Sequence, residues 1–429
     1  MKNASKLGYV QARNKSLENT IKFSRTLING GGKLKNLSVV IRKSSLLLAL
    51  PAVLAIRLIS PMLLIRIGQT NAGRVGHFAI ETELALCAKK IRTKDSMLPI
   101  ILDLYYINGN ISNQYLYEQW KKVIPYFPKW LLQPIHRINQ KIPNAGKYNA
   151  FAKASDQNME ILDAIEPIIK LEDSDELLAQ TILKQIGIEK DDKFVCLCVR
   201  DDSYLKETFP TENWDEHNHR DSDVQTYLLA GEALASRGYK VLRMGKITKE
   251  KLETDSTSVI DYANSSIRSD MLDVYLFSKA KFIISNATGM DYMGAIFRVP
   301  IGLVNTVTSE SVKSGRIIRL YQPKTFYDAT DGHLLNMVEL VKRGFNYSYH
   351  ASDYLKMNIK MQDNSSEEIM KFALELQELV EREDDVISSD DVKIILRESG
   401  SKNSALSKIS HEWLKTHQYF FSSAQVAEK

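Results

Sequence analysis

Four polar clusters in the sequence each follow a short apolar run of the kind that forms a buried strand. In an open parallel sheet, ligands bind beyond the carboxyl ends of the strands. Clusters at these positions therefore predict a shared site for a polar or charged ligand. They are Arg200-Asp201-Asp202-Ser203-Tyr204 after 194–199, Arg243-Met244-Gly245-Lys246 after 239–242, Ser285-Asn286-Ala287-Thr288-Gly289-Met290-Asp291 after 282–284, and Asn305-Thr306 after 301–304.

The turn Ser285–Gly289 is the strongest candidate for a phosphate site. Its small residues let the backbone approach a ligand, and a helix that opens at Gly289 would turn its free N–H groups toward an anion. Arg243 could add a charge-assisted clamp. A plain helix start with Ser/Thr caps is the alternative. No GxGxxG motif follows any predicted strand, so a nicotinamide-dependent enzyme is not indicated.

The segment 68–75 comes close to a P-loop, because a strand precedes it and its glycines have the right spacing. Arg74 replaces the lysine, however, and Val75 cannot hold magnesium as Ser or Thr would, which argues against an NTPase. Just beyond it, His77 and Glu81 stand at i and i+4 on a predicted helix, so the carboxylate could orient the imidazole as a base. A capped helix start with a solvated histidine is the alternative.

The segment 218–223 allows three interpretations. Asp221-x-Asp223 is the spacing with which some sugar transferases bind a metal and a nucleotide, but the preceding residues are polar, and helix capping is the better account. His217-x-His219 could bind a metal, although no third ligand is evident. The segment could also fold over a bound nucleotide or sugar, with Asn218 and Arg220 as donors.

Strands alternate with helices along most of the chain, which predicts an α/β fold with doubly wound parallel sheets. We expect two Rossmann-like domains that face a cleft, over 61–185 and 190–345, followed by a helical tail over 346–429. The expected strands are 62–67, 98–103, 193–199, 239–243, 259–261, 282–284 and 301–304, and the expected helices are 77–90, 222–237, 271–278, 289–297 and 365–382.

Composition and charge narrow the class of protein. The 429 residues are 44% hydrophobic and 25% charged, which is typical of a globular chain, and three cysteines cannot build a disulfide framework. Residues 1–60 hold eleven Lys and Arg against Glu18 alone, beside an uncharged run at 46–56. That run is shorter than the roughly 20 residues that span a bilayer, so the arm 1–60 predicts a helix on an anionic membrane surface. A solvated arm beside a core helix is the alternative. No zinc finger or basic–aromatic pattern supports nucleic acid as a partner.

Several of these segments resemble a family of bacterial glycosyltransferases that are encoded among surface-polysaccharide genes. The family is similar to two-domain GT-B transferases, which bind a nucleotide sugar in the C-terminal domain, receive the acceptor near the N-terminal domain and usually need no metal. The resemblance covers about 60–345 and the tail 409–414, and it rests on 66–78, 218–223, RMG at 243–245, 261–263, SDMLDVYL at 269–276 and 285–290.

The resemblance implies a glycosyltransferase, hexosyl or related, that moves a sugar from a nucleotide-sugar donor to a glycan or lipid-linked acceptor in surface-polysaccharide synthesis. We expect it to be cytoplasmic and peripheral to the inner membrane, with no metal or cofactor. A GT-B-shaped sugar-nucleotide epimerase and a non-catalytic partner in polysaccharide assembly are the alternatives. The expected base is His77 with Glu81, or Asp201. The expected substrate-binding residues are Arg66, Gly68, Gly76, Arg200, Asn218, His219, Arg220, Arg243, Met244, Gly245, Ser285, Thr288, Gly289, Met290 and Asp291.

Overall fold

A computed structural model describes residues 49–92, 100–151, 156–307, 315–345, 350–382 and 409–421 of the chain. The chain forms two compact units. The first unit comprises Met1–Gln69, Met97–Ile107 and Tyr126–Ala150, and the second unit comprises Thr70–Ser96, Asn108–Pro125 and Phe151–Lys429. Each unit is described by itself.

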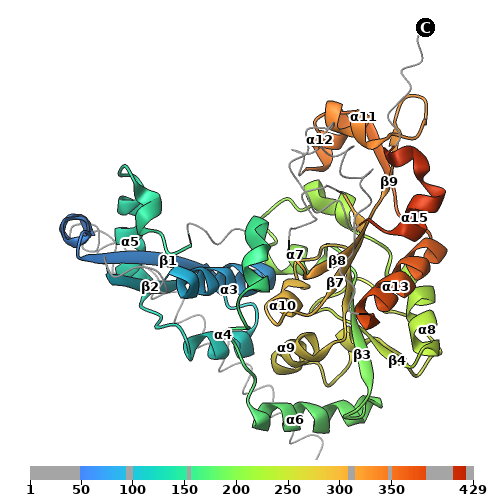
Figure 1. Ribbon diagram of the computed structural model, residues 1–429, viewed down its shortest axis with the longest axis horizontal. Coiled ribbons are helices and arrows are strands. Elements are labelled where there is room, and N and C mark those ends of the chain that lie inside the picture. The colour runs from blue at the N-terminus through green and yellow to red at the C-terminus, as the bar shows by residue number, and fades with distance from the viewer. Residues whose placement is uncertain are drawn as a thin grey trace, which may run out of the picture. The chain divides into compact units, whose positions relative to one another are not determined.

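A six-stranded parallel sheet forms the centre of the second unit (Figure 1). Its strand order is β5-β4-β3-β6-β7-β8, so the chain winds outward from β3 in one direction and from β6 in the other. This is the Rossmann order, and it confirms the predicted α/β class with parallel strands. The strands are β3 (Lys193–Cys198), β4 (Tyr239–Arg243), β5 (Val259–Ile260), β6 (Ile283–Ser285), β7 (Ile301–Thr306) and β8 (Ile318–Pro323).

Helices cover both faces of this sheet. Successive strand residues point to opposite faces. Ile284 therefore belongs to the core under α8 (Leu228–Ser236) and α13 (Ser366–Glu381), and Ile283 lies against α10 (Tyr292–Ala295). Figure 1 shows α9 (Asp270–Lys279) beside α10 on that second face. The hydrophobic core under α8 and α13 includes Val195, Leu197, Leu234, Val241, Phe282, Val304, Leu320, Phe372 and Leu376.

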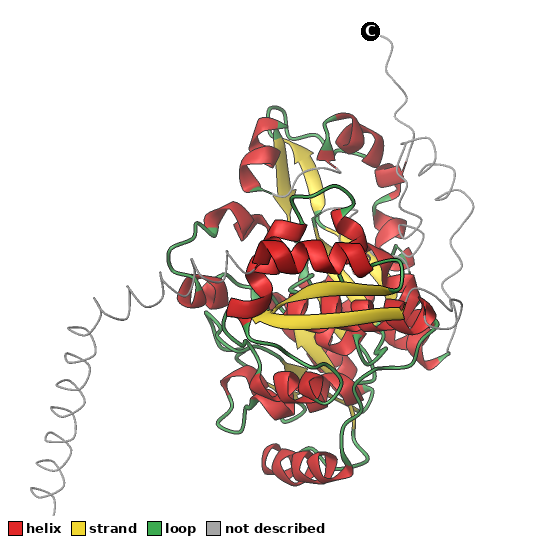
Figure 2. Ribbon diagram, turned by 90° about the vertical axis from the view of Figure 1, so that its left-hand side faces the viewer, coloured by secondary structure: helices red, strands yellow, loops and turns green. Residues whose placement is uncertain are grey.

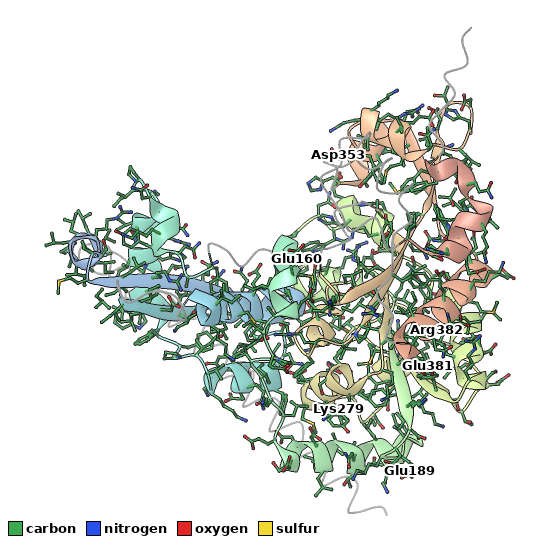
Figure 3. The ribbon with its side chains drawn as sticks, in the orientation of Figure 1. Glu160, Glu189, Lys279, Asp353, Glu381 and Arg382 are labelled. Atoms are coloured by element: carbon green, nitrogen blue, oxygen red, sulfur yellow. The ribbon has the colours of Figure 1, made fainter. Side chains whose placement is uncertain are left out.

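Polar contacts join the outer helices of the second unit to these layers. Lys279 at the end of α9 pairs with Glu176 of α6 at 2.5 Å, and Glu381 of α13 accepts a hydrogen bond from the Tyr239 hydroxyl at 2.7 Å (Figure 3). The remaining described α-helices and strands of this unit are α3 (Val75–Arg92), α4 (Gln114–Lys121), α6 (Asp173–Leu183), α7 (Ser203–Thr208), β9 (Thr325–Asp328), α11 (Met337–Lys342), α12 (Ala351–Lys356), β10 (Ile359–Gln362) and α15 (His411–Thr416).

The first unit is built around the pair of strands β1 (Leu63–Asn71) and β2 (Ile100–Asn108), whose last residues belong to the second unit. A helix over 49–59 and α5 (Lys129–Asn139) accompany them (Figure 2). Within the unit, Arg66 of β1 and Asp103 of β2 form a buried bidentate ion pair with two 2.6 Å contacts.

Most of the predicted elements are confirmed, including the helix at 365–382, which packs on the sheet as α13. Two local predictions are wrong. Gly68 lies inside β1, so the loop before α3 is shorter than the P-loop-like spacing implied, and α10 begins at Tyr292 rather than Gly289 and has four residues. Strands β8, β9 and β10 were not predicted. Residues 1–48 of the basic arm lie outside the described residues, and none of the described helices combines the length and apolar character needed to cross a bilayer. The predicted domain limits stay a prediction.

Candidate active site

A cavity of about 620 Å³ opens within the second unit at the carboxyl ends of β3, β4 and β6. The chain diverges between β3 and β6, and this topological switch point is where α/β sheets bind ligands. The volume lies in the range of small-molecule sites. Its polar and aromatic lining includes Arg74, His77, Glu81, Arg200, Asp201, Tyr204, Trp214, His217, His219, Arg220, Lys246, Thr248, Thr288, Asp291 and Tyr354.

The loops after β3 and β6 are fastened together at the base of this cavity. The Asn286 side chain accepts a hydrogen bond from the Arg200 amide at 2.8 Å and donates one to the Arg220 carbonyl at 3.1 Å. The Arg220 guanidinium in turn donates to the Ala287 carbonyl at 2.6 Å. Two arginines that are twenty residues apart in the sequence are thereby brought to the same cavity.

These cations repel one another. Burial, and then the charge of Arg220, lower the pKa of Arg200 to about 10, although Asp221 lies 2.9 Å away and opposes the shift. Burial, followed by the charges of Arg220 and Arg200, lowers the pKa of His219 to about 4, so its imidazole is neutral at pH 7. Arg74 also lines the cavity and acts on Arg200 in the same direction. An anion bound beside Arg200 and Arg220 would offset this repulsion.

The turn after β6 is arranged differently from our prediction. The amides of Ala287 and Thr288 donate to the Ser285 hydroxyl at 3.1 and 3.4 Å, and the amide of Met290 donates to the Thr288 hydroxyl at 3.0 Å. Ser285 also donates to the buried Asp291 carboxylate at 2.7 Å. Side chains of the turn thus use the amides that were expected to hold an anion. The helix after the turn is a single turn long, and its dipole adds little.

Arg243 and Asp201 also differ from their predicted roles. Arg243 is 1% exposed and is absent from the cavity lining; it contacts Asp261 at 3.3 Å and Asp201 at 3.9 Å from beneath. Asp201 reaches the cavity, but its two oxygens accept the amides of Ser203 and Lys249 at 2.9 and 3.0 Å. Both side chains organise the loops after β3 and β4, which leaves Asp201 a weaker candidate base than His77.

The predicted pair at the start of α3 is formed. The His77 Nδ1 atom lies 2.6 Å from one Glu81 carboxylate oxygen. The other Glu81 oxygen accepts a hydrogen bond from the side-chain amide of Asn71 at 3.0 Å. Both His77 and Glu81 line the cavity. The carboxylate is held from two sides and fixes the imidazole by Nδ1, which leaves Nε2 as the nitrogen that can exchange a proton with a ligand.

Gly76 makes this arrangement possible. A Cβ atom at Gly76 would lie 2.5 Å from the carbonyl oxygen of Gly289, closer than real Cβ atoms come to backbone. Gly289 itself has φ +82°, a conformation that favours glycine. The start of α3 and the turn after β6 therefore meet backbone to backbone, immediately before His77.

The cavity gathers most, but not all, of the predicted substrate-binding residues. Gly76, Arg200, His219, Arg220, Met244, Gly245, Thr288, Gly289, Met290 and Asp291 line it. Arg66 and Gly68 belong to the first unit, where Arg66 is buried against Asp103. Asn218 is exposed and donates to Asp215 at 3.2 Å. Ser285 is buried under the turn that it supports.

Several lining residues were missed as binding residues, among them Arg74, Trp214, Lys246 and Tyr354. Arg74 lies 4.8 Å over the ring of Trp214, and the Tyr354 ring lies 5.0 Å from that of His219. The Lys246 ammonium contacts the Ser112 carbonyl at 2.6 Å. Arg74 and Lys246 could have been predicted from the sequence, because each lies in a loop that follows a predicted strand. The sequence held no signal for Trp214 and Tyr354, which depend on tertiary packing.

The metal-binding interpretations find little support. Asp221 pairs with Arg200, and Asp223 accepts the Gln225 amide at 2.9 Å as a cap. Arg200 and Arg220 lower the pKa of both His217 and His219, after burial, which disfavours a cation there. Within the described ranges, the group with ligand atoms close enough for a metal is Asp328, Asp331 and His333, none of which lines the cavity.

Comparison with known proteins gives structural matches alone. Neither the known family models nor the curated proteins match the sequence. The E. coli ADP-heptose lipopolysaccharide heptosyltransferase II is 13% identical over 74% of this chain and 99% of its own, with a TM-score of 0.40. A family 9 glycosyl transferase from Veillonella parvula is 13% identical over 74% and 97%, also at 0.40. The dodecameric iron-containing heptosyltransferase TibC, in complex with ADP-D-β-D-heptose, is 10% identical over 76% of each chain at 0.33.

The contact at Gly76 gives a test of how the cavity is assembled. We expect Gly76→Ala to destabilise the protein by about 1–3 kcal/mol, because the new methyl group must push α3 away from Gly289. Gly146→Ala is the matched control, since a Cβ there meets nothing within 4 Å, and it should stay within about 0.5 kcal/mol of wild type. Urea unfolding measures both. Equal stability of the two variants would show that the close approach is not a constraint.

Proposed function

We propose that this protein is a glycosyltransferase that moves a sugar from a nucleotide-sugar donor to a hydroxyl of a glycan or lipid-linked acceptor. One observation carries the proposal: mutually repelling arginines and a histidine held by a carboxylate face the same cavity at the switch point of the sheet. Such a site suits a reaction in which a phosphate ester leaves and a hydroxyl loses its proton.

In the proposed reaction, the donor diphosphate lies against Arg74, Arg200 and Arg220. As the bond between the sugar C1 and the diphosphate oxygen breaks, negative charge grows on the leaving diphosphate. Fixed guanidinium groups in a partly dehydrated cavity stabilise that charge without reorganising. This assignment replaces the main-chain amides after β6, which are bound to side chains of their own turn.

The acceptor hydroxyl forms the new bond to C1 and releases its proton to His77. Nε2 of His77 takes the proton while Nδ1 stays against Glu81, so the imidazolium that forms has a carboxylate partner at 2.6 Å. The products are the glycosylated acceptor, whose new glycosidic oxygen is neutral, and the nucleoside diphosphate, which leaves as an anion with the electrons of the broken C1–O bond. We further propose surface-polysaccharide synthesis at the inner face of the membrane as the setting.

Nucleotide binding is the first experiment. We expect nucleoside diphosphates and nucleotide sugars, ADP-heptose among them, to raise the melting temperature as ligand concentration exceeds Kd. Arg220→Ala and Arg74→Ala should each weaken that binding about tenfold or more, because each removes a charge-assisted contact to phosphate. Arg382→Ala, an exposed arginine at the end of α13, is the control (Figure 3). No stabilisation by any nucleotide would contradict the proposal and favour a non-catalytic role.

Binding should also be linked to protonation of His219. The pKa of about 4 in the free protein results from burial and from Arg220 and Arg200. A bound diphosphate offsets those cations and raises the pKa of His219, so the complex takes up protons at about pH 5.5. Titration calorimetry of pyrophosphate in buffers of different ionisation enthalpy measures this uptake. His219→Asn should lower the uptake, and the remainder belongs to groups such as Asp221, whose pKa burial raises to about 6. Uptake that is unchanged in His219→Asn would place the titrating group elsewhere.

His77 is the test of the chemistry. We expect His77→Ala to lower kcat by about 10²–10⁴-fold while donor affinity stays near wild type, because a general base acts in the transition state. His333→Ala is a matched control: His333 also lies 2.6 Å from a carboxylate, that of Asp331, but outside the cavity. Release of nucleoside diphosphate in the presence of an acceptor is the readout. Near wild-type turnover by His77→Ala rejects this base, and an altered sugar nucleotide without any acceptor would indicate the epimerase.

A further inference from the structure

The described surface of the first unit is apolar to an unusual degree. On the helix over 49–59, Leu50, Leu54 and Leu58 follow one another every four residues and are 51%, 58% and 82% exposed. The opposite side of the same helix is buried through Ala49, Val53 and Ile56. Met62, just beyond the helix, is 75% exposed. A surface helix normally has one apolar face, which packs on the core, and one polar face, which contacts water. This helix has apolar side chains on the solvent-exposed face as well.

The first turn of α5 adds a second apolar element. Trp130 and Leu131 are 59% and 42% exposed there. Arg57 ties the helix over 49–59 to the far end of α5, with its Nε donating to the Asn139 side chain at 2.8 Å. Figure 1 shows the two helices at the same end of β1, and Figure 2 looks onto that end. We call the exposed side chains of Leu50, Leu54, Leu58, Met62, Trp130 and Leu131 the apolar surface.

Charge around the apolar surface has a single sign. The described part of the first unit contains six basic residues and one acid, Asp103, which is buried in its ion pair with Arg66. Its exposed charges are therefore all positive; they include Lys129, Arg137, Lys141 and Lys147. Exposed leucines elsewhere are placed differently: Leu177 and Leu178 on α6 follow Asp173, Asp175 and Glu176.

We propose that the apolar surface docks on an anionic phospholipid bilayer, with the leucines, Met62 and Trp130 in the interface and the lysines against the headgroups. Apolar side chains with basic neighbours are what an interfacial helix needs, and tryptophan favours the boundary between hydrocarbon and water. Each lysine near an anionic leaflet adds attraction. A second copy of this chain fits less well, because two such surfaces would repel each other. The inference does not depend on the proposed reaction.

The test is sedimentation of the whole chain with vesicles of phosphatidylcholine, with or without phosphatidylglycerol. We expect stronger binding to the anionic vesicles, and weaker binding at high salt. Leu54→Ser with Leu58→Ser, and separately Trp130→Ser with Leu131→Ser, should each weaken binding to anionic vesicles by about tenfold, because apolar area no longer leaves water. These side chains are exposed, so the variants should fold.

Leu177→Ser with Leu178→Ser is the matched control and should bind as wild type does. Three outcomes overturn the proposal. Equal binding by all variants would mean that basic residues alone attract the vesicles. Equal losses in the control would mean that the effect is not specific to the apolar surface. A dimer in light scattering that Leu54→Ser with Leu58→Ser dissociates, without vesicle binding, would assign the surface to a second copy.

Discussion

The backbone contact between Gly76 and Gly289 is the constraint on which the candidate site depends. The Cβ atom of any other residue at Gly76 would lie 2.5 Å from the Gly289 carbonyl oxygen, which is too close. The same helix is fixed farther along by an ion pair at 2.8 Å between the buried Glu83 and Arg298. These two contacts fix the position of α3, and they thereby place His77 in the lining of the cavity. Positioning of this kind, by a backbone contact and a buried ion pair, favours a preorganised base.

Electrostatics gives that cavity its second property. Burial lowers the pKa of both Arg200 and Arg220, and the charge of Arg220 lowers that of Arg200 further. Burial and the same two cations keep His219 neutral. Burying these charges costs stability in the free protein. Asp221 offsets part of that cost, and burial raises its own pKa to about 6. An anionic ligand bound beside the two guanidinium groups would offset the repulsion between them. Groups with perturbed pKa values are common at binding and catalytic sites, because the fold gains no stability from placing like charges together.

The sequence predicted the sheet well because its strands are short, apolar and regularly spaced. The sequence also predicted that the polar clusters after these strands lie near one another, since parallel strands bring their carboxyl ends to the same edge of the sheet. It could not show that Ser285 and Thr288 would use the amides of their own turn, because an identical cluster of small polar residues caps a turn or binds an anion equally well. Arg243 follows a strand as Arg200 does, yet one lies beneath the loops and the other reaches the cavity. That difference arises from tertiary packing and leaves no local signal.

Charge is divided between the two units in a way that bears on where the protein works. By sequence, the residues of the first unit include sixteen Lys and Arg against two acids, and those of the second unit 41 against 50. An anionic surface therefore attracts the first unit and repels the second. The basic unit also holds the exposed leucines and Trp130, whereas the exposed leucines of α6 follow acids. Electrostatic attraction and apolar contact thus both favour binding of the first unit to an anionic surface. The cavity belongs to the second unit, whose net charge is negative.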